Sequence, residues 1–251
     1  MKIAGMLRVK NEARWIGRVL DSIAPICSSV HVFDDRSSDD TAAISLAHGA
    51  DVYPTPFEPC IDETRDKNYL FKQIMEDAEP DWILHVDGDE ELEPAGVEQI
   101  RASIASGQAP AYGLQVLYLW NDEKHIRTDG VYKRFCRQSL FSTRGTDGIF
   151  NPTAHGKGTA ANLHCTNVPA DLVARSMMCP ARLIHYGYID RAMRLAKYEF
   201  YNTVDPDNEL EDRYRHIVAG DIPEVPARAI TKWAGPLTIE PFAPVQVEVL
   251  A

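Results

Sequence analysis

Four carboxylates crowd into five positions at the end of an apolar segment, in the stretch "WILHVDGDEEL" at 82–92. Asp87 and Asp89 cannot both enter a dry core, because burying an unpaired carboxylate costs several kcal/mol. They must face water, basic side chains or a cation. Oxygen ligands without clustered His or Cys suit a hard ion, Mg²⁺ or Mn²⁺, which also binds substrate phosphates. On spacing alone, a solvated acidic turn ahead of a helix is the favoured alternative.

Other charged residues could serve related chemistry. Asp34 and Asp35 follow a second apolar segment, and Lys157, in "HGKGTA", and Lys197 could each contact a phosphate. The stretch around Lys157 lacks the G-x-x-x-x-G-K-[ST] spacing of a phosphate-cradling loop, so we reject that interpretation.

The elements that position these residues alternate between strand and helix. Apolar segments and amphipathic helical segments repeat about four times in the first ~110 residues, which predicts an α/β fold with a mostly parallel sheet flanked by helices. Ligands of such sheets bind outside the carboxyl ends of the strands. Both acidic pairs follow strand ends, so we expect them at the same edge. The expected strands are 3–9, 30–33, 51–53 and 82–86.

The second half of the chain has a different pattern. Longer strand-like segments at 112–120 and 131–141 precede a loop rich in Gly, Thr and Asn, and a short strand and a helix near 190–201 follow. Proline and acidic residues dominate the end of the chain. The expected division is one domain at 1–204, with a first half at 1–110 and a second half at 111–204, and an extension at 205–251.

Composition and charge exclude several classes of protein. A net charge of −11 over 251 residues argues against general nucleic-acid binding, which needs a basic surface. The five cysteines contain no C-x-x-C pair, which indicates a reduced, cytoplasmic protein without a zinc or redox motif. No stretch predicts a transmembrane segment, and charges follow the N-terminal apolar run too soon for a signal peptide. Peripheral contact with a membrane stays open.

Four segments of the first half carry a resemblance to a known family. They are "VKNEARWIGRVLDSI", "VHVFDDRSSDDT", "TRDKNYLF" and "DWILHVDGDEEL". In order and spacing, over roughly the first 95 residues, they resemble the N-terminal half of glycosyltransferase family 2 proteins with the GT-A fold. The later "RLIHYGY", followed by a helix with Lys197, also resembles such proteins, whereas the part between Asp122 and Cys179 shows little likeness.

The resemblance implies a metal-dependent glycosyltransferase of the hexosyltransferase type. It would move a sugar from a UDP-, GDP- or dTDP-sugar to an acceptor hydroxyl, with inversion and with Mn²⁺ or Mg²⁺ as cofactor. Cleavage leaves a diphosphate with extra negative charge, which a divalent ion neutralises. A protein of net charge −11 could thus bind an anion, because carboxylates hold the ion and the ion holds the diphosphate.

The resemblance also implies roles for individual residues. Asp89, the last acid of the D-x-D motif, would ligate the ion directly, and Asp87 would lie near the ribose and the metal. Asp34 or Asp35 would hydrogen-bond the base, and Arg65 would lie near the base or the diphosphate. The expected nucleotide-sugar-binding set also contains Lys10 and Asn11, which follow the first strand.

The second half supplies further candidates. His185, in "IHYGY", is expected as a metal ligand because GT-A enzymes often supply a late histidine, and a structural histidine is the alternative. His155 and Lys157, in "NPTAHGKG", and Lys197 are expected near the acceptor or a phosphate.

The general base that an inverting transfer needs has no obvious motif in this chain. Asp147, in "RGTDGIF", is the leading candidate for this catalytic role, because its loop is expected to face the cleft. Asp129 and Glu199 are weaker candidates. The competing interpretation is that Asp147 stabilises a glycine-rich turn.

Two other functions stay open. A nucleotidyltransferase could use a similar sheet and similar acids, but it would carry a glycine-rich basic loop after the first strand, and no glycine occurs between Arg8 and Gly17. A degenerate sugar-binding domain could keep the fold without the chemistry. The unclear base favours this second alternative, and the intact acidic pairs argue against it.

Overall fold

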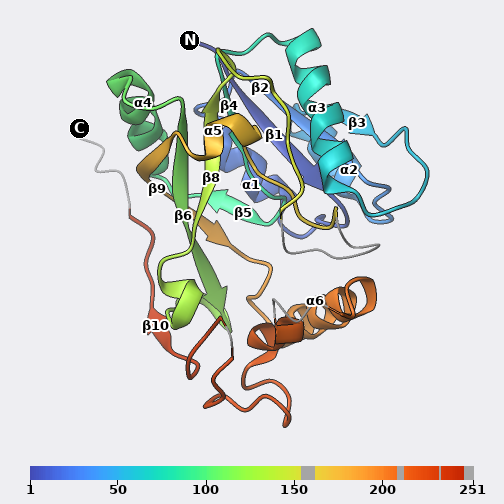
Figure 1. Ribbon diagram of the computed structural model, residues 1–251, viewed down its shortest axis with the longest axis vertical. Helices are drawn as coiled ribbons and strands as arrows, with labels where there is room; N and C mark the ends of the chain where they lie inside the picture. The colour runs from blue at the N-terminus through green and yellow to red at the C-terminus, as the bar shows by residue number, and fades with distance from the viewer. Residues whose placement is uncertain (154–161, 208–211, 232, 246–251) are drawn as a thin grey trace.

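The computed structural model describes residues 1–153, 162–207, 212–231 and 233–245. Its first half alternates strands and helices, as the sequence predicts (Figure 1). These elements are β1 (Ile3–Val9), α1 (Ile16–Ile23), β2 (Ser29–Asp34), α2 (Thr41–Ala47), β3 (Asp51–Pro54), α3 (Glu63–Asp77) and β4 (Trp82–His85).

The strands of the first half pair in parallel, in the order β3-β2-β1-β4. Val9 of β1 lies opposite Asp34 of β2, and Met6 of β1 lies opposite His85 of β4. Parallel pairing brings the carboxyl ends of the strands to one edge, so the loops after β1, β2 and β4 leave the sheet together. The predicted α/β fold is confirmed, and both acidic pairs lie at this edge.

Helices cover both faces of the parallel strands. On one face, Leu7 belongs to a buried cluster with Ile16 of α1 and Ile100 of α4 (Gly96–Ser106). On the other face, Phe33 clusters with Leu70 of α3. Each fully buried aliphatic side chain stabilises the fold by about 2 kcal/mol. The sheet edge is thus anchored by a core on either side.

The short strand β5 and three strands of the second half extend the sheet. They are β5 (Glu90–Leu92), β6 (Ala111–Trp120), β8 (Cys136–Ser142) and β9 (Ser176–His185). β8 pairs with β4 in the antiparallel direction, and β6 lies between β8 and β9. The short β5 also pairs with β9, with Glu90 opposite His185. This register brings the end of β9 against the acidic segment that follows β4.

The remaining elements belong to the second half and to the extension. They are β7 (Asp122–Arg127), the 3-10 helices η1 (Gly130–Lys133) and η3 (Asp212–Val218), α5 (Ala170–Val173), α6 (Arg191–Val204) and β10 (Ile239–Pro241). β10 pairs with β7, so part of the expected extension adds a strand to the sheet. α6 lies apart from the helices of the first half, at the lower right of Figure 1.

One buried tryptophan ties α6 to the sheet. The guanidinium carbon of Arg127 lies 4.7 Å from the ring centre of Trp120, and that of Arg194 in α6 lies 4.4 Å from it. Arg127 forms a paired hydrogen bond with Asp129, and Arg194 does so with Asp221. Desolvated cation–π contacts of this kind are worth about 2 kcal/mol each. These contacts position α6 so that its Lys197 side chain can reach Asp89.

Two further observations concern the whole described chain. None of the described helices combines the length and apolar character that crossing a bilayer requires. The five cysteines are all free thiols.

Candidate active site

Asp89 lies in the turn after β4 and forms the centre of the site. Its backbone is held by the residue that follows β9, because the Tyr186 N–H donates to the Asp89 carbonyl at 2.9 Å. Its carboxylate is 5% exposed. The Lys197 Nζ of α6 lies 2.9 Å from Asp89 Oδ2, and the His185 Nε2 lies 3.6 Å from the same oxygen. A carboxylate, an imidazole and an ammonium therefore converge on one point.

Gly187 makes this convergence sterically possible. A Cβ atom at this position would lie 2.2 Å from both Asp89 Oδ2 and Lys197 Nζ, and 2.7 Å from His185 Cε1. Such separations are far below van der Waals contact. The glycine of "IHYGY" therefore provides the space in which the three side chains meet.

The charges at this point follow from burial and from the neighbours. Burial raises the pKa of Asp89, but the charges of Lys197 and then of His185 lower it. Their combined effect outweighs burial, so the pKa of Asp89 lies below its usual range. Burial lowers the pKa of His185 to about 4, so its imidazole is neutral at neutral pH. Burial lowers and Asp89 raises the pKa of Lys197, with a net increase. The site thus holds a carboxylate, a neutral imidazole and an ammonium.

Asp87 points to a different partner from Asp89. Its Oδ2 accepts a hydrogen bond from Arg137 Nη1 of β8 at 2.6 Å, and Arg137 also donates to Glu90. Arg137 counters the effect of burial and lowers the pKa of Asp87, whereas burial raises the pKa of Glu90 to about 8. Sequence analysis did not identify Arg137. The sequence signal that could have identified Arg137 is its position within the strand-like segment 131–141.

Glu12 is a second residue that sequence analysis missed. Burial and then the charge of Asp89 raise the pKa of Glu12 to about 9. Its side chain crosses the segment after β4, because a Cβ on Gly88 would lie 2.8 Å from Glu12 Cγ. A carboxylate two positions after Lys10, beyond the end of β1, was the signal that could have placed it at this edge.

Asp35 lies in the loop after β2, at the same edge of the sheet. It accepts hydrogen bonds from Arg8 Nη2 at 3.0 Å and from Arg36 Nη1 at 2.7 Å. Lys10 Nζ lies 3.5 Å from Asp35 Oδ2. Asp34 has a local partner, because its carboxylate accepts from the backbone N–H of Ser37 at 3.3 Å. Of the two acids, Asp35 is the one surrounded by cations.

Arg65 reaches the same region from the first turn of α3. Its guanidinium carbon lies 4.2 Å from the ring centre of Phe57, and its Nη2 lies 2.7 Å from Asp66 Oδ1. Asp66 is fully buried and also accepts from Arg8 Nε at 2.9 Å. Neither Arg8 nor Asp66 was identified from the sequence.

Asn11 connects two of the loops at this edge. Its side-chain oxygen accepts from the Ser38 N–H at 2.8 Å, and its own N–H donates to Ser37 Oγ at 2.9 Å. The loop after β1 is thereby fastened to the loop after β2. Asn11 holds this position with a φ of 57°, a left-handed conformation that asparagine tolerates better than most residues.

The donor atoms fit a divalent ion held by two protein ligands. Among the described residues, no cluster of three or more His, Cys, Asp or Glu could hold a metal. Asp89 and His185 remain as a carboxylate and a neutral imidazole facing each other, and the His185 Nδ1 has no hydrogen-bond partner. Mg²⁺ and Mn²⁺ commonly take one or two protein ligands and complete their shell with water and phosphate oxygens. Asp87, engaged by Arg137, does not join them here.

The leading candidate for the general base, Asp147, does not lie at this edge. β8 runs antiparallel to β4 with Ser142 opposite Trp82, so the loop that contains Asp147 leaves the sheet at the amino end of β4. The Asp147 Oδ1 accepts from the Ile149 N–H at 2.9 Å, which is the turn-stabilising role. The expectation that Asp147 faces the cleft is therefore wrong. Because β8 runs antiparallel to β4, the loop after β8 leaves the sheet at the edge opposite to Asp89.

The other acceptor-side candidates have separate positions. Asp129 is paired with Arg127, and Glu199 is exposed on α6. His155 and Lys157 lie outside the described residues.

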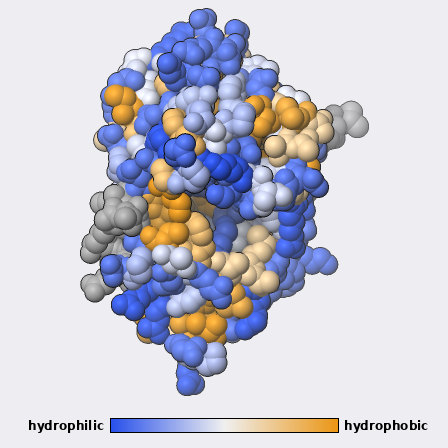
Figure 2. Space-filling model, turned by 90° about the vertical axis from the view of Figure 1, so that its right-hand side faces the viewer, coloured by the Kyte–Doolittle hydropathy of each residue, from blue (hydrophilic) through white to orange (hydrophobic). Residues whose placement is uncertain are grey.

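Between the first half and α6, the molecule is hollowed on the face shown in Figure 2, where hydrophobic and hydrophilic side chains border the depression.

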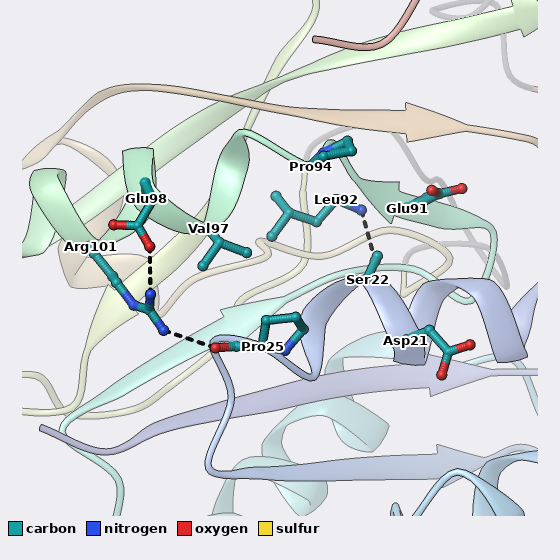
Figure 3. A pocket seen from close by; sticks show the side chains of 9 residues that line it. All are labelled: Asp21, Ser22, Pro25, Glu91, Leu92, Pro94, Val97, Glu98 and Arg101. Atoms are coloured by element: carbon teal, nitrogen blue, oxygen red, sulfur yellow. Dashed lines mark hydrogen bonds and ion pairs between the residues drawn. The ribbon is translucent and has the colours of Figure 1, made fainter. Parts of the chain in front are cut away.

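A separate hollow of about 480 Å³ lies between α1, β5 and α4 (Figure 3). Asp89, His185 and Lys197 do not line it. Its polar groups are engaged within the protein, because Ser22 Oγ accepts from the Leu92 N–H and Arg101 donates to Glu98 and to the Pro25 carbonyl. Ser22, Glu98 and Arg101 of this hollow are therefore bonded to other groups of the protein.

Comparisons with known proteins place the chain among relatives. No protein-family model matches it. An uncharacterized glycosyltransferase of Rickettsia conorii is 32% identical over 204 residues, which cover 80% of this chain and 68% of the relative. An uncharacterized protein of Mycobacterium tuberculosis is 29% identical over 221 residues, covering 82% of this chain and 51% of that protein. The chain thus spans about half the length of the mycobacterial relative.

Among solved structures, the chain is similar to glucosyl-3-phosphoglycerate synthase of Mycobacterium tuberculosis, which was crystallised with Mn²⁺, UDP and phosphoglyceric acid. The identity is 23% and the TM-score 0.37, over 47% of this chain and 43% of that one.

Proposed function

Because this chain belongs to the glycosyltransferase family of its Rickettsia conorii relative, we propose that it transfers a sugar from a nucleotide-sugar to an acceptor hydroxyl. Membership agrees with the resemblance to family 2 enzymes of the GT-A fold. The observation that carries the proposal is the convergence of Asp89, His185 and Lys197 at the carboxyl edge of the parallel strands. An anionic diphosphate would meet a cationic and ion-binding point at the position where such sheets bind ligands.

In this proposal, Asp89 and His185 would hold Mn²⁺ or Mg²⁺. The bound ion supplies Lewis-acid neutralisation of the charge that develops on the leaving diphosphate. Neutral His185 offers a nitrogen lone pair without first losing a proton, and the buried Asp89 stays ionised. Lys197 adds a single positive charge beside them, and its three N–H donors suit phosphate oxygens.

The nucleotide would lie along the loops after β1 and β2. Asp35 is held in place by Arg8 and Arg36, so its carboxylate can accept base N–H groups without reorganising. Arg65, stacked on Phe57, would contact the base or the diphosphate. Asp87, whose side chain is 41% exposed and fixed by Arg137, would accept ribose hydroxyls.

The hexosyl nature of the sugar, the inverting outcome and the cytoplasmic location stay predictions from the sequence. The second candidate function, a sugar-binding domain without transfer activity, is favoured by one observation. Asp147, the leading candidate for the general base, lies in a loop that leaves the sheet at the edge opposite to Asp89. Under this alternative the donor and ion would still bind, and no sugar would move.

Thermal unfolding with a ligand panel tests the proposal. We expect UDP-, GDP- or dTDP-sugars, or their diphosphates, to raise the melting temperature only with Mn²⁺ or Mg²⁺ present, because ligands that bind the native state stabilise it. Asp89→Ala should abolish this shift, and Glu98→Ala, an exposed acid on α4, should retain it. Donor hydrolysis, or transfer to an acceptor extract, then separates the enzyme from the binding domain. Failure of every nucleotide to bind would refute the proposal.

A further inference from the structure

Lys197 contacts the oxygen of Asp89 that also faces His185. The Asp89 side chain is almost fully buried, whereas that of Lys197 is 30% exposed. An uncompensated buried carboxylate is costly, and Lys197 provides the compensating charge in the absence of an ion. The Lys197 Nζ also lies 5.2 Å from the Tyr188 ring centre, which is a weak cation–π contact.

The backbone is shaped for this ion pair. Gly187 leaves the space in which Lys197 Nζ and Asp89 Oδ2 come within 2.9 Å, and any larger residue would put a Cβ 2.2 Å from both atoms. α6 is fixed by the paired hydrogen bonds of Arg194 with Asp221, so the root of the Lys197 side chain is anchored. Beyond this root, the lysine stem is long and flexible.

A divalent ion and the ammonium would compete for this oxygen. Asp89 and His185 would hold the ion, and the Oδ2 of Asp89 is also the oxygen that lies 2.9 Å from Lys197 Nζ. Two cations that share one carboxylate repel each other, so entry of the ion favours release of Lys197 from Asp89. A diphosphate on the ion would offer the displaced ammonium new anionic partners, which water alone does not.

We propose that Lys197 is a built-in counter-cation of Asp89 that exchanges with the divalent ion and thereby couples ion binding to diphosphate binding. The inference rests on the proposed function, because it concerns the same diphosphate site. The ion alone must displace Lys197 without compensation and binds weakly. The ion together with a diphosphate transfers the ammonium from a carboxylate to phosphate oxygens and binds tightly.

Mn²⁺ titrations followed by the EPR signal of the free ion test the exchange without measuring activity. Lys197→Met should tighten the binding of Mn²⁺ alone about tenfold, a typical coupling between sites. Lys197→Gln, which is also neutral, provides the same test if the Met variant is unstable. Lys197→Arg keeps the charge, and Lys72→Met removes an exposed lysine on α3, so both should bind Mn²⁺ as the wild type does.

A second titration measures the coupling. With saturating UDP, GDP or dTDP, whichever binds best, wild-type affinity for Mn²⁺ should rise about tenfold or more, and the neutral variants should lose most of this gain. Equal affinity of wild type and neutral variants for Mn²⁺ alone, or no Mn²⁺ binding by any of them, would overturn the exchange. Failure of all nucleotides to bind, with the Mn²⁺-alone difference intact, would refute the proposed function and leave the exchange standing.

Discussion

Asp35 and Asp89 are buried carboxylates at the same sheet edge, but their partners are of different kinds. Asp35 accepts from two guanidinium groups, those of Arg8 and Arg36, whose charge is permanent and whose planar geometry is fixed. Asp89 faces the ammonium of Lys197 and a neutral imidazole, and the flexible Lys197 side chain is 30% exposed.

This difference suggests a division of labour between the two halves. The guanidinium network of the first half, which includes fully buried Asp66, holds its acids in one geometry. The partners of Asp89 come from the second half and can be replaced, because Lys197 can reach water and His185 is already neutral. A rigid surface suits recognition of a nucleotide, and a replaceable partner suits an ion that enters and leaves.

The largest effect is expected for Asp66→Ala. Removing the carboxylate leaves Arg8 and Arg65 without their shared buried partner, and breaking a buried pair costs about 3–5 kcal/mol of unfolding free energy. Urea unfolding measures the loss. Glu76→Ala, an exposed position on the same helix, should change stability by less than about 0.5 kcal/mol. A loss below about 1 kcal/mol in Asp66→Ala would mean that the guanidinium network does not hold its acids in one geometry.

Asp89→Asn should give the opposite pattern. Donor turnover should fall about 100- to 1,000-fold, as when one element of charge stabilisation is removed. Stability should change by about 1 kcal/mol or less, because the released Lys197 can hydrate. Turnover and urea unfolding on the same preparation provide the comparison. A loss of stability as large as that of Asp66→Ala would erase the distinction between the two carboxylates.

Arg65→Met should weaken nucleotide binding more moderately. The variant removes the stack on Phe57 and one partner of Asp66, whereas Arg8 remains bonded to Asp66. Loss of one stacked arginine predicts about a tenfold rise in the Kd of the diphosphate. Calorimetry with Mn²⁺ present measures it, and Arg144→Met, an exposed arginine at the opposite edge, is the control. Unchanged affinity would exclude Arg65 from the nucleotide site.

The smallest effect is a pH dependence in the first half. His31 of β2 is buried, and although Asp51 opposes the effect, burial lowers its pKa below 6.5. The unfolded chain therefore binds the proton more readily than the folded protein, so stability should decrease as the pH falls through 6.5. The slope from one histidine is at most about 1.4 kcal/mol per pH unit. His31→Gln should flatten the unfolding free energy measured between pH 7.5 and 5.5, and an unchanged slope would contradict the assignment.

Some residues missed by sequence analysis have a common physical explanation. Arg8 and Asp66 carry charges that look exposed in a linear sequence, and they pair with each other from two different elements, whereas Glu12 is partly buried near Asp89. Arg137 is similar, because its partners Asp87 and Glu90 follow β4 whereas it lies on β8. Patterns of apolar spacing report which face of an element is buried, and they contain no information on which charges will pair.

By itself, the sequence determined the strands, the helices that alternate with them and the shared edge of the acids after β2 and β4, because hydrophobic period and parallel crossovers are local properties. The tertiary structure alone decided what each acid meets. Lys197 reaches Asp89 across 108 positions of chain, in a space that Gly187 leaves open. It also decided that Asp147 lies at the opposite edge, since the direction of β8 is set by its pairing with β4 and not by its own residues.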